Sequence, residues 1–229
     1  MKKTFLCAFR HSLPVLFGFL PLGLAYGILM QESGYGAGWT ALCSSTVLAG
    51  SLQFLMVSFF GGGFSILTVA LLALSLNSRH IFYGLSFIER FRSCGAAKWF
   101  LIFTLTDEAY SLHCSFEPED GVNENAAHII IGALVMFYWV LFSVLGALAG
   151  SLISFDTTGL DFALTALFIT ILIDQIRAAE SYAPALMAAA ASAVSLLIFG
   201  ADGFILPALI LSTAGLFLLR REPKKEAAK

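Results

Sequence analysis

Apolar runs long enough to cross a membrane recur along the whole chain, separated by short polar stretches. They lie at about 12–31, 39–60, 63–88, 99–116, 127–153, 160–176, 183–199 and 203–219. We interpret all of them as helices, because an open sheet would leave unpaired edges in lipid and the two-residue alternation of a membrane barrel is absent. At roughly 20 apolar residues per crossing, the pattern predicts an all-α polytopic membrane protein with about six to eight transmembrane segments.

Composition agrees with this pattern. The 229 residues are 59% hydrophobic and 12% charged, with a mean hydropathy of +0.87. Such a chain has little room for a soluble domain, so we expect one integral membrane domain over residues 1–229. Its net charge of −2 offers no basic face for phosphates, which excludes nucleic acid as a partner.

Positive charge predicts the orientation, because Lys and Arg in short loops stay on the cytoplasmic side. The basic residues gather in three places: Lys2, Lys3 and Arg10; Arg90, Arg92 and Lys98; Arg220, Arg221, Lys224 and Lys225. The loops at 31–38 and 117–125 contain neither Lys nor Arg and are expected outside. Both termini are therefore expected in the cytoplasm.

The number of apolar runs conflicts with this orientation. Two runs separate the loop at 31–38 from the basic loop at 89–98, and four runs separate the loop at 117–125 from the basic C-terminus. In both cases the chain must pass from the outside to the cytoplasm, which requires an odd number of crossings. One interpretation is an inverted repeat, with halves 1–116 and 126–229 that each contain one broken or re-entrant helix. The candidate elements are 44–63, with Gly50 and Ser51 at its centre, and 160–175. The other interpretation is an ordinary eight-helix bundle in which the charge rule fails at one loop.

The run "LALSLNSRHIFYGLSF" at 72–87 places Asn77, Arg79 and His80 inside a predicted span. In an unbroken helix Arg79 lies about 15 Å from the basic loop at Arg90, too deep for easy contact with water. A charge at that depth costs on the order of 2.5–3.5 kcal/mol, so it requires an anion or a water-filled cavity. Alternatively, the helix ends earlier and these residues face the headgroups.

Asp107 and Glu108 in "TLTDEAYS" are the natural partners of Arg79. Adjacent helical residues point about 100° apart, so only one of these acids can face the arginine. The other is a candidate proton carrier. A static ion pair between two helices is the structural alternative.

Four further residues complete the candidate set: Gln53, Ser45, Gly50 and Asp161. Gln53 and Ser45 are suited to bind an ammonium or carboxylate group, or equally to join neighbouring helices, whereas Gly50 and Asp161 belong to the two candidate broken elements. His113 and Cys114 lack further ligands for a metal site, and Ser51 lacks the flanks of a nucleophile elbow. We therefore expect no metal, no cofactor and no enzymatic activity.

The blocks "LPLGLAYGILMQESGYGAGWTALCSSTVLAGSLQF", "LNSRHIFYG", "TLTDEAYS" and "LDFALTALFITILIDQ" resemble, in this order, the AzlC family (YgaZ-type) of bacterial branched-chain amino acid export permeases. The resemblance implies a multi-pass protein of the bacterial cytoplasmic (inner) membrane that exports leucine, isoleucine, valine and methionine. It also implies a small AzlD-type membrane subunit as partner. It supplies no residue roles.

From the residues we expect Arg79 to receive a substrate carboxylate or to hold Asp107 in an ion pair that substrate and protons perturb. His80, Asp107 or Glu108 would then carry a proton. A passive facilitator or channel and a non-transporting scaffold subunit remain the alternatives.

Overall fold

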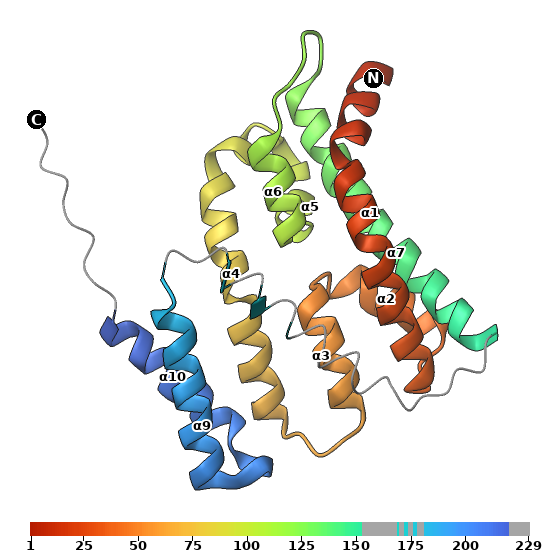
Figure 1. The fold of residues 1–229 in the computed structure, drawn as a ribbon. Helices are drawn as coiled ribbons and strands as arrows, with labels where there is room; N and C mark the ends of the chain where they lie inside the picture. The colour runs from red at the N-terminus through yellow and green to blue at the C-terminus, as the bar shows by residue number, and fades with distance from the viewer. Residues whose placement is uncertain (153–168, 170–171, 174–175, 178–180, 220–229) are drawn as a thin grey trace, which may run out of the picture. The chain divides into compact units, whose positions relative to one another are not determined.

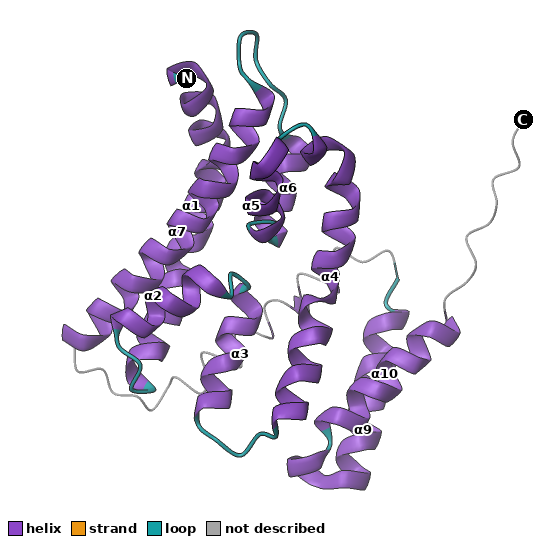
Figure 2. Ribbon diagram, turned by 180° about the vertical axis from the view of Figure 1, so that it is seen from behind, coloured by secondary structure: helices purple, strands orange, loops and turns teal. Residues whose placement is uncertain are grey.

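The computed structural model describes residues 1–152, 169, 172–173, 176–177 and 181–219. It divides into two compact units, Met1–Leu160 and Asp161–Lys229, which are considered separately. Within the described residues every regular element is helical (Figures 1 and 2), and four helices are long and apolar enough to span a membrane: Lys2–Glu32, Ile66–Arg92, Glu124–Leu152 and Ala183–Gly200. The predicted all-α membrane fold is thus confirmed. Asp161 and most of the candidate element at 160–175 lie outside the described residues.

The first unit is built around two long parallel helices, α1 (Lys2–Glu32) and α7 (Glu124–Leu152), which pack against one another. They start together, because Asn123 N donates to Thr4 Oγ1 at 3.4 Å, and Ser12 Oγ contacts Tyr138 Oη at 3.0 Å further along. Their contact is close because small residues face one another. A Cβ on Gly27 would collide with the backbone of Ser143 and Ala147.

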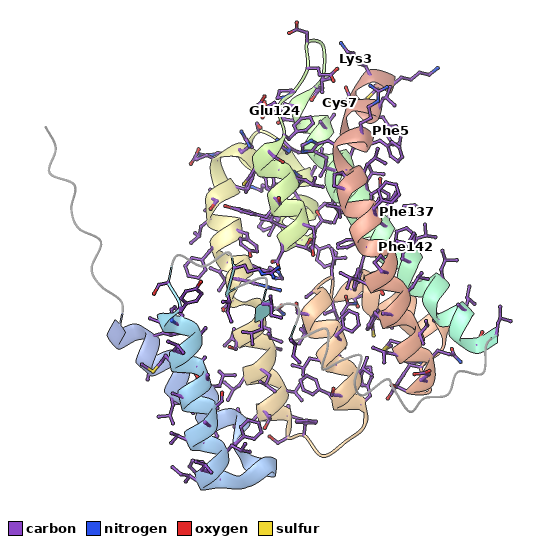
Figure 3. All side chains as sticks on the ribbon, viewed as in Figure 1. Lys3, Phe5, Cys7, Glu124, Phe137 and Phe142 are labelled. Carbon is purple, nitrogen blue, oxygen red and sulfur yellow. The ribbon has the colours of Figure 1, made fainter. Side chains whose placement is uncertain are left out.

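The side on which α1 begins is called the N-terminal side below, and the side on which it ends is the opposite side. Figure 3 shows Lys3 and Glu124 at the same end of the unit. The outer faces of α1 and α7 carry exposed aromatic residues such as Phe5 and Phe137, as expected for surfaces in lipid.

The first candidate for a broken element is re-entrant. Helix α2 (Ala37–Thr46) leads inward from the opposite side, the chain breaks at Val47–Ala49, and α3 (Gly50–Phe60) returns (Figure 2). Both ends lie on the opposite side, because the rings of Tyr35 and Phe60 are 4.4 Å apart. Leu48 has φ +43° and Ala49 is extended, so the helix cannot continue. The break predicted at Gly50 is confirmed.

Helix α4 (Ile66–Arg92) then crosses to the N-terminal side. Its end is fixed there, because Ser93 Oγ donates to Asn125 Oδ1 at 2.8 Å, beside the start of α7. The alternative in which this helix ends before Arg79 is wrong, since α4 continues for a further 13 residues.

The run at 99–116 does not cross. After a turn of 3-10 helix (Gly95–Ala97), α5 (Lys98–Phe103) leads inward, the chain breaks at 104–106, and α6 (Asp107–Ser115) returns to the N-terminal side. There Ser115 Oγ lies 3.3 Å from His11 Nε2 of α1. The expectation of a single helix with Asp107 at its middle is therefore wrong. The first piece ends at Phe103, and Thr106, with an extended backbone, caps α6 by accepting a hydrogen bond from Ala109 N.

This second re-entrant pair also changes the expected position of the loop at 117–125. Lys3 Nζ donates to Asp120 O, so the loop lies on the N-terminal side and not across the membrane from it. The acidic loop thus shares a side with the basic residues at 2–10 and 90–98. Counting the run at 99–116 as a crossing produced the error.

Residues 2–60 and 66–115 share one order of elements. Each begins with a long helix and continues with a re-entrant pair, and the two long helices run in opposite directions. This is the arrangement of an inverted repeat, although both copies lie within what the sequence suggested as one half, 1–116. The division at 1–116 and 126–229 stays a prediction.

The second unit contains α9 (Ala183–Gly203) and α10 (Ile205–Leu219), which pack on one another. Gly215 allows the contact, because a Cβ there would lie 2.7 Å from Met187 Sδ. Gly200 adopts φ +71° near the end of α9, where the helix is kinked.

Candidate functional site

Arg79 joins the tips of the two re-entrant pairs. It is the central residue of the 27-residue α4. Its Nη1 lies 2.9 Å from Asp107 Oδ2, at the first residue of α6, and its Nη2 donates to Ser51 Oγ at 3.2 Å, at the second residue of α3. The N-termini of two helices that return to opposite sides therefore meet at one guanidinium group.

The electrostatics of this point favour negative charge. The first turns of α3 and α6 expose backbone N–H groups and the positive ends of their helix dipoles, and Arg79 adds a full cation. The carboxylate of Asp107 offsets part of this charge. Both partners remain partly accessible, with exposed side-chain fractions of 29% and 36%, so a ligand can reach them.

His80 and Glu108 flank the ion pair. His80 Nε2 lies 3.8 Å from Asp107 Oδ1, close enough for the protonation state of either group to affect the other. Glu108 makes no ion pair with any residue that the structure describes. Only one of the two adjacent acids faces Arg79, in keeping with the 100° rotation between them.

Several buried polar atoms around the two breaks have no hydrogen-bond partner among the described residues. They are Tyr26 Oη, Ser44 Oγ, Gln53 Nε2, Arg79 Nε and Asp107 Oδ1. An unsatisfied buried polar group costs about 1–3 kcal/mol, so such a concentration requires an explanation. Donors and acceptors held ready for a polar ligand or for water provide one.

Gln53 and Gly50 lie beside Trp139 of α7. Trp139 Nε1 donates to Gln53 Oε1 at 2.7 Å, and a Cβ on Gly50 would lie 3.5 Å from Trp139 Cη2. Tyr26 stacks on the same indole with ring centroids 5.9 Å apart. An aromatic, mostly apolar wall thus adjoins the N-terminus of α3, next to the position where Ser51 meets Arg79.

The remaining sequence candidates are not joined to this centre. Ser45 Oγ donates to carbonyls of its own helix, Ala41 O at 2.7 Å and Leu42 O at 3.1 Å. Asn77 is half-buried two residues before Arg79 and has no recorded side-chain partner in the described part of the chain. Asp161 lies outside the described residues. Among the described residues no group of three or more His, Cys, Asp and Glu side chains is arranged to hold a metal ion.

Nothing in the sequence distinguishes Trp139 from an ordinary packing residue, and its hydrogen bond to Gln53 is evident only in the folded structure. The start of α6 was missed too, although Thr106, Asp107 and Glu108 form the usual signature of a helix N-terminus: a capping residue followed by acids in the first turn. An apolar run on both sides of this signature made a continuous helix the simpler interpretation.

The fold and the site define a polytopic α-helical membrane protein in which two oppositely directed re-entrant pairs meet at a partly accessible ion pair. Residues 14–153, which include all of this site, match the family model described as AzlC protein. The chain belongs to the AzlC family.

Similar proteins cover nearly the whole chain. It is 36% identical over 224 residues to the branched-chain amino acid transport protein AzlC of Bacillus subtilis, covering 98% of this chain and 88% of that protein. It is 33% identical to a membrane protein of Helicobacter pylori strain J99, covering 96% of each, and 26% identical over 190 residues to the inner membrane protein YgaZ of Escherichia coli, covering 79% of this chain and 76% of that one. No solved structure matches the chain.

Proposed function

We propose that this protein is a secondary transporter that exports branched-chain or similar hydrophobic amino acids across the bacterial cytoplasmic membrane. The observation that carries the proposal is Arg79 bridging the N-termini of α3 and α6. In transporters built from inverted repeats, the substrate site lies near the midplane at the ends of such discontinuous helices. The name of the Bacillus subtilis relative supports the substrate class.

The chemistry around Arg79 suits a zwitterion with an aliphatic side chain. The substrate carboxylate would bind between Arg79 and the first N–H groups of α3, where the dipole and the cation both attract it. Its ammonium group would be received by Asp107 Oδ1 and the polar atoms near Gln53. Leucine, isoleucine, valine or methionine would place the side chain against Trp139 and Tyr26.

Coupling to protons would follow from competition for Asp107. The substrate ammonium group and a proton would both bind the carboxylate of Asp107, so a proton from the outside releases the substrate there, and substrate from the cytoplasm releases the proton inside. His80, 3.8 Å away, and Glu108 are further carriers. The proton gradient supplies about 1.4 kcal/mol per pH unit and about 2.3 kcal/mol per 100 mV, enough to expel substrate against a gradient.

Two further parts of the proposal concern the orientation of the protein in the membrane and its partner subunit. The N-terminus would lie in the cytoplasm, because Lys2, Lys3, Arg90 and Arg92 share its side of the first unit. A small AzlD-type membrane subunit would accompany the chain. No step of this function is enzymatic.

The test is release of labelled leucine from vesicles that contain the full chain, with and without an AzlD-type subunit, as a pH gradient is imposed and collapsed. Wild type should release leucine in step with the gradient. Arg79→Gln should abolish this release while remaining inserted and monodisperse. Arg92→Gln is the matched control, because Arg92 is exposed and its recorded ion pair is to Glu89 of the same helix.

Each other outcome overturns a defined part of the proposal. Release that ignores the gradient would indicate a passive facilitator. No release of any branched-chain amino acid, with the partner present, would indicate a scaffold subunit. Equal release by wild type and Arg79→Gln would remove Arg79 from the mechanism.

A further inference from the structure

A second buried polar group lies nearer the N-terminal side, between α6 and α7. His113 and His128 are both fully buried, with their Nδ1 atoms 2.9 Å apart and their ring centroids 4.9 Å apart. At this distance one Nδ1 must carry a hydrogen and the other must offer its lone pair. The two neutral rings are therefore held as opposite tautomers that share one hydrogen bond.

The outer end of this histidine pair reaches a carboxylate at the surface. His128 Nε2 lies 3.6 Å from Glu124 Oε1, and the Glu124 side chain is 46% exposed. The other charged and titratable groups that face the pair are Arg90 of α4, which donates to His113 O at 3.1 Å, and His11 of α1, whose Nε2 lies 3.0 Å from Leu112 O. Among the described residues, Glu124 is thus the one acid in contact with the pair.

The pair adjoins the contact between α4 and α6, which leads to the site. A row of rings runs from His113 to His80, which lies 3.8 Å from Asp107: Phe87 packs against His113 at 5.8 Å and against Tyr110 at 5.5 Å, Tyr110 stacks on Tyr83 at 4.5 Å, and Tyr83 packs on His80 at 5.8 Å. His113 and Asp107 lie six residues apart on the same helix, about 9 Å along its axis.

Both Nε2 atoms of the pair are buried and have no hydrogen-bond partner among the described residues. A pair retained only for packing gains nothing from two unsatisfied ring nitrogens, each of which costs stability. If the pair conducts a proton, by contrast, one Nε2 atom must be free to accept the proton and the other must be free to release it.

We propose that His128 and His113 form a proton relay between Glu124 at the N-terminal side and the centre of the protein at Asp107. A proton binds Nε2 of His128, the Nδ1 proton of His128 passes to Nδ1 of His113, and His113 releases its Nε2 proton inward. At each ring one N–H bond forms and one breaks, so both rings end neutral and one proton has moved. The proposal rests on the proton-coupled transport proposed above and assigns its path.

The test uses His113→Asn in the leucine-loaded vesicles described above, with two measurements. The asparagine amide can still hydrogen-bond to His128 Nδ1 but cannot pass a proton. We expect exchange of labelled for unlabelled leucine at equal pH to remain near wild type, since exchange moves no net proton. Gradient-driven release should fall on the order of 10²-fold, the scale of a lost proton-transfer group.

His11→Asn is the matched control, because His11 contacts the same helix without belonging to the pair, and it should keep both activities. If His113→Asn keeps gradient-driven release, the relay is wrong. If His113→Asn and His128→Asn each lose exchange together with driven release, the pair is a structural contact and the relay is likewise wrong.

A measurement without transport separates this inference from the proposed function and from any folding defect. In His11→Asn/His80→Asn protein labelled with ¹⁵N-histidine, the two remaining imidazoles are the pair. We expect the ¹⁵N shifts of the two rings to be those of opposite neutral tautomers, one ring with its hydrogen on Nδ1 and the other with its hydrogen on Nε2. Shifts that assign the same tautomer to both rings would overturn the relay even if leucine transport is proton-coupled, because two such rings cannot share an Nδ1 proton.

Discussion

At the scale of single residues, the central feature is Arg79, which contacts side chains at the N-termini of two helices at once. Arg79 has one bond to a carboxylate and one to a hydroxyl, and its Nε has no hydrogen-bond partner among the residues that the structure describes. Because a guanidinium group cannot lose its proton in a protein, the charge persists throughout any transport cycle. Whatever moves through this point must therefore be compatible with a permanent cation.

The Arg79–Asp107 ion pair leads to a prediction about the thermal stability of the protein. Removing one partner leaves the other charge partly buried without a counterion, whereas removing both leaves only neutral groups. We expect Arg79→Gln and Asp107→Asn each to lower the thermal unfolding temperature in detergent more than the double variant does. Single-variant losses that simply add in the double variant would show that the two side chains do not interact.

A second prediction concerns the buried amide of Gln53. Trp139→Phe removes the indole N–H that Gln53 accepts and should lower the free energy of unfolding by about 1–3 kcal/mol, the usual cost of a buried unsatisfied group. Chemical denaturation measures the change. The matched control is Trp99→Phe, since Trp99 is 69% exposed, and an equal loss in the control would contradict the assignment.

At the scale of elements, the two long helices α1 and α7 depend on small residues where they meet. Gly23 and Gly27, one turn apart, face Phe142, Ser143 and Ala147 with no space for a side chain. In lipid, helix association depends on this kind of close packing, because the hydrophobic effect does not favour one apolar contact over another.

Gly27→Val is therefore expected to separate α1 from α7 and to yield aggregated or rapidly degraded protein. Gly18→Val provides the control with the same side chain in the same helix, because a Cβ at Gly18 has no neighbour within 4 Å. Size-exclusion chromatography of the two variants measures the difference. Similar monodisperse peaks for both would contradict the packing.

At the scale of the whole molecule, the arrangement of the first unit predicts which loops share a side. Single cysteines introduced as Lys3→Cys and Glu119→Cys, in a chain without its native cysteines, should react with an impermeant maleimide from the same side of oriented vesicles. Ser33→Cys should react only from the other side, since it follows the end of α1. If positions 3 and 119 react from opposite sides, the arrangement described here is wrong and the topology expected from charge alone is correct.

The sequence was sufficient for the all-α membrane fold, it named 44–63 as a candidate for a broken element, and it paired Arg79 with Asp107 or Glu108 without choosing between them. The contact follows from depth, because two opposite charges far from water must find each other. The second re-entrant pair and the histidine pair were not foreseen. From the sequence, His113 and His128 belong to two spanning helices joined by an outside loop. Their rings meet only because α6 returns to the N-terminal side and because α6 and α7 each turn their histidine toward the other helix.

Binding of labelled leucine to the purified full chain tests the central claim most directly, since it depends on neither coupling nor direction. We predict saturable binding by wild type and by Arg92→Gln, and loss of binding by Arg79→Gln that is folded and monodisperse. Undiminished leucine binding by Arg79→Gln would contradict the account, because the substrate carboxylate would then be held elsewhere.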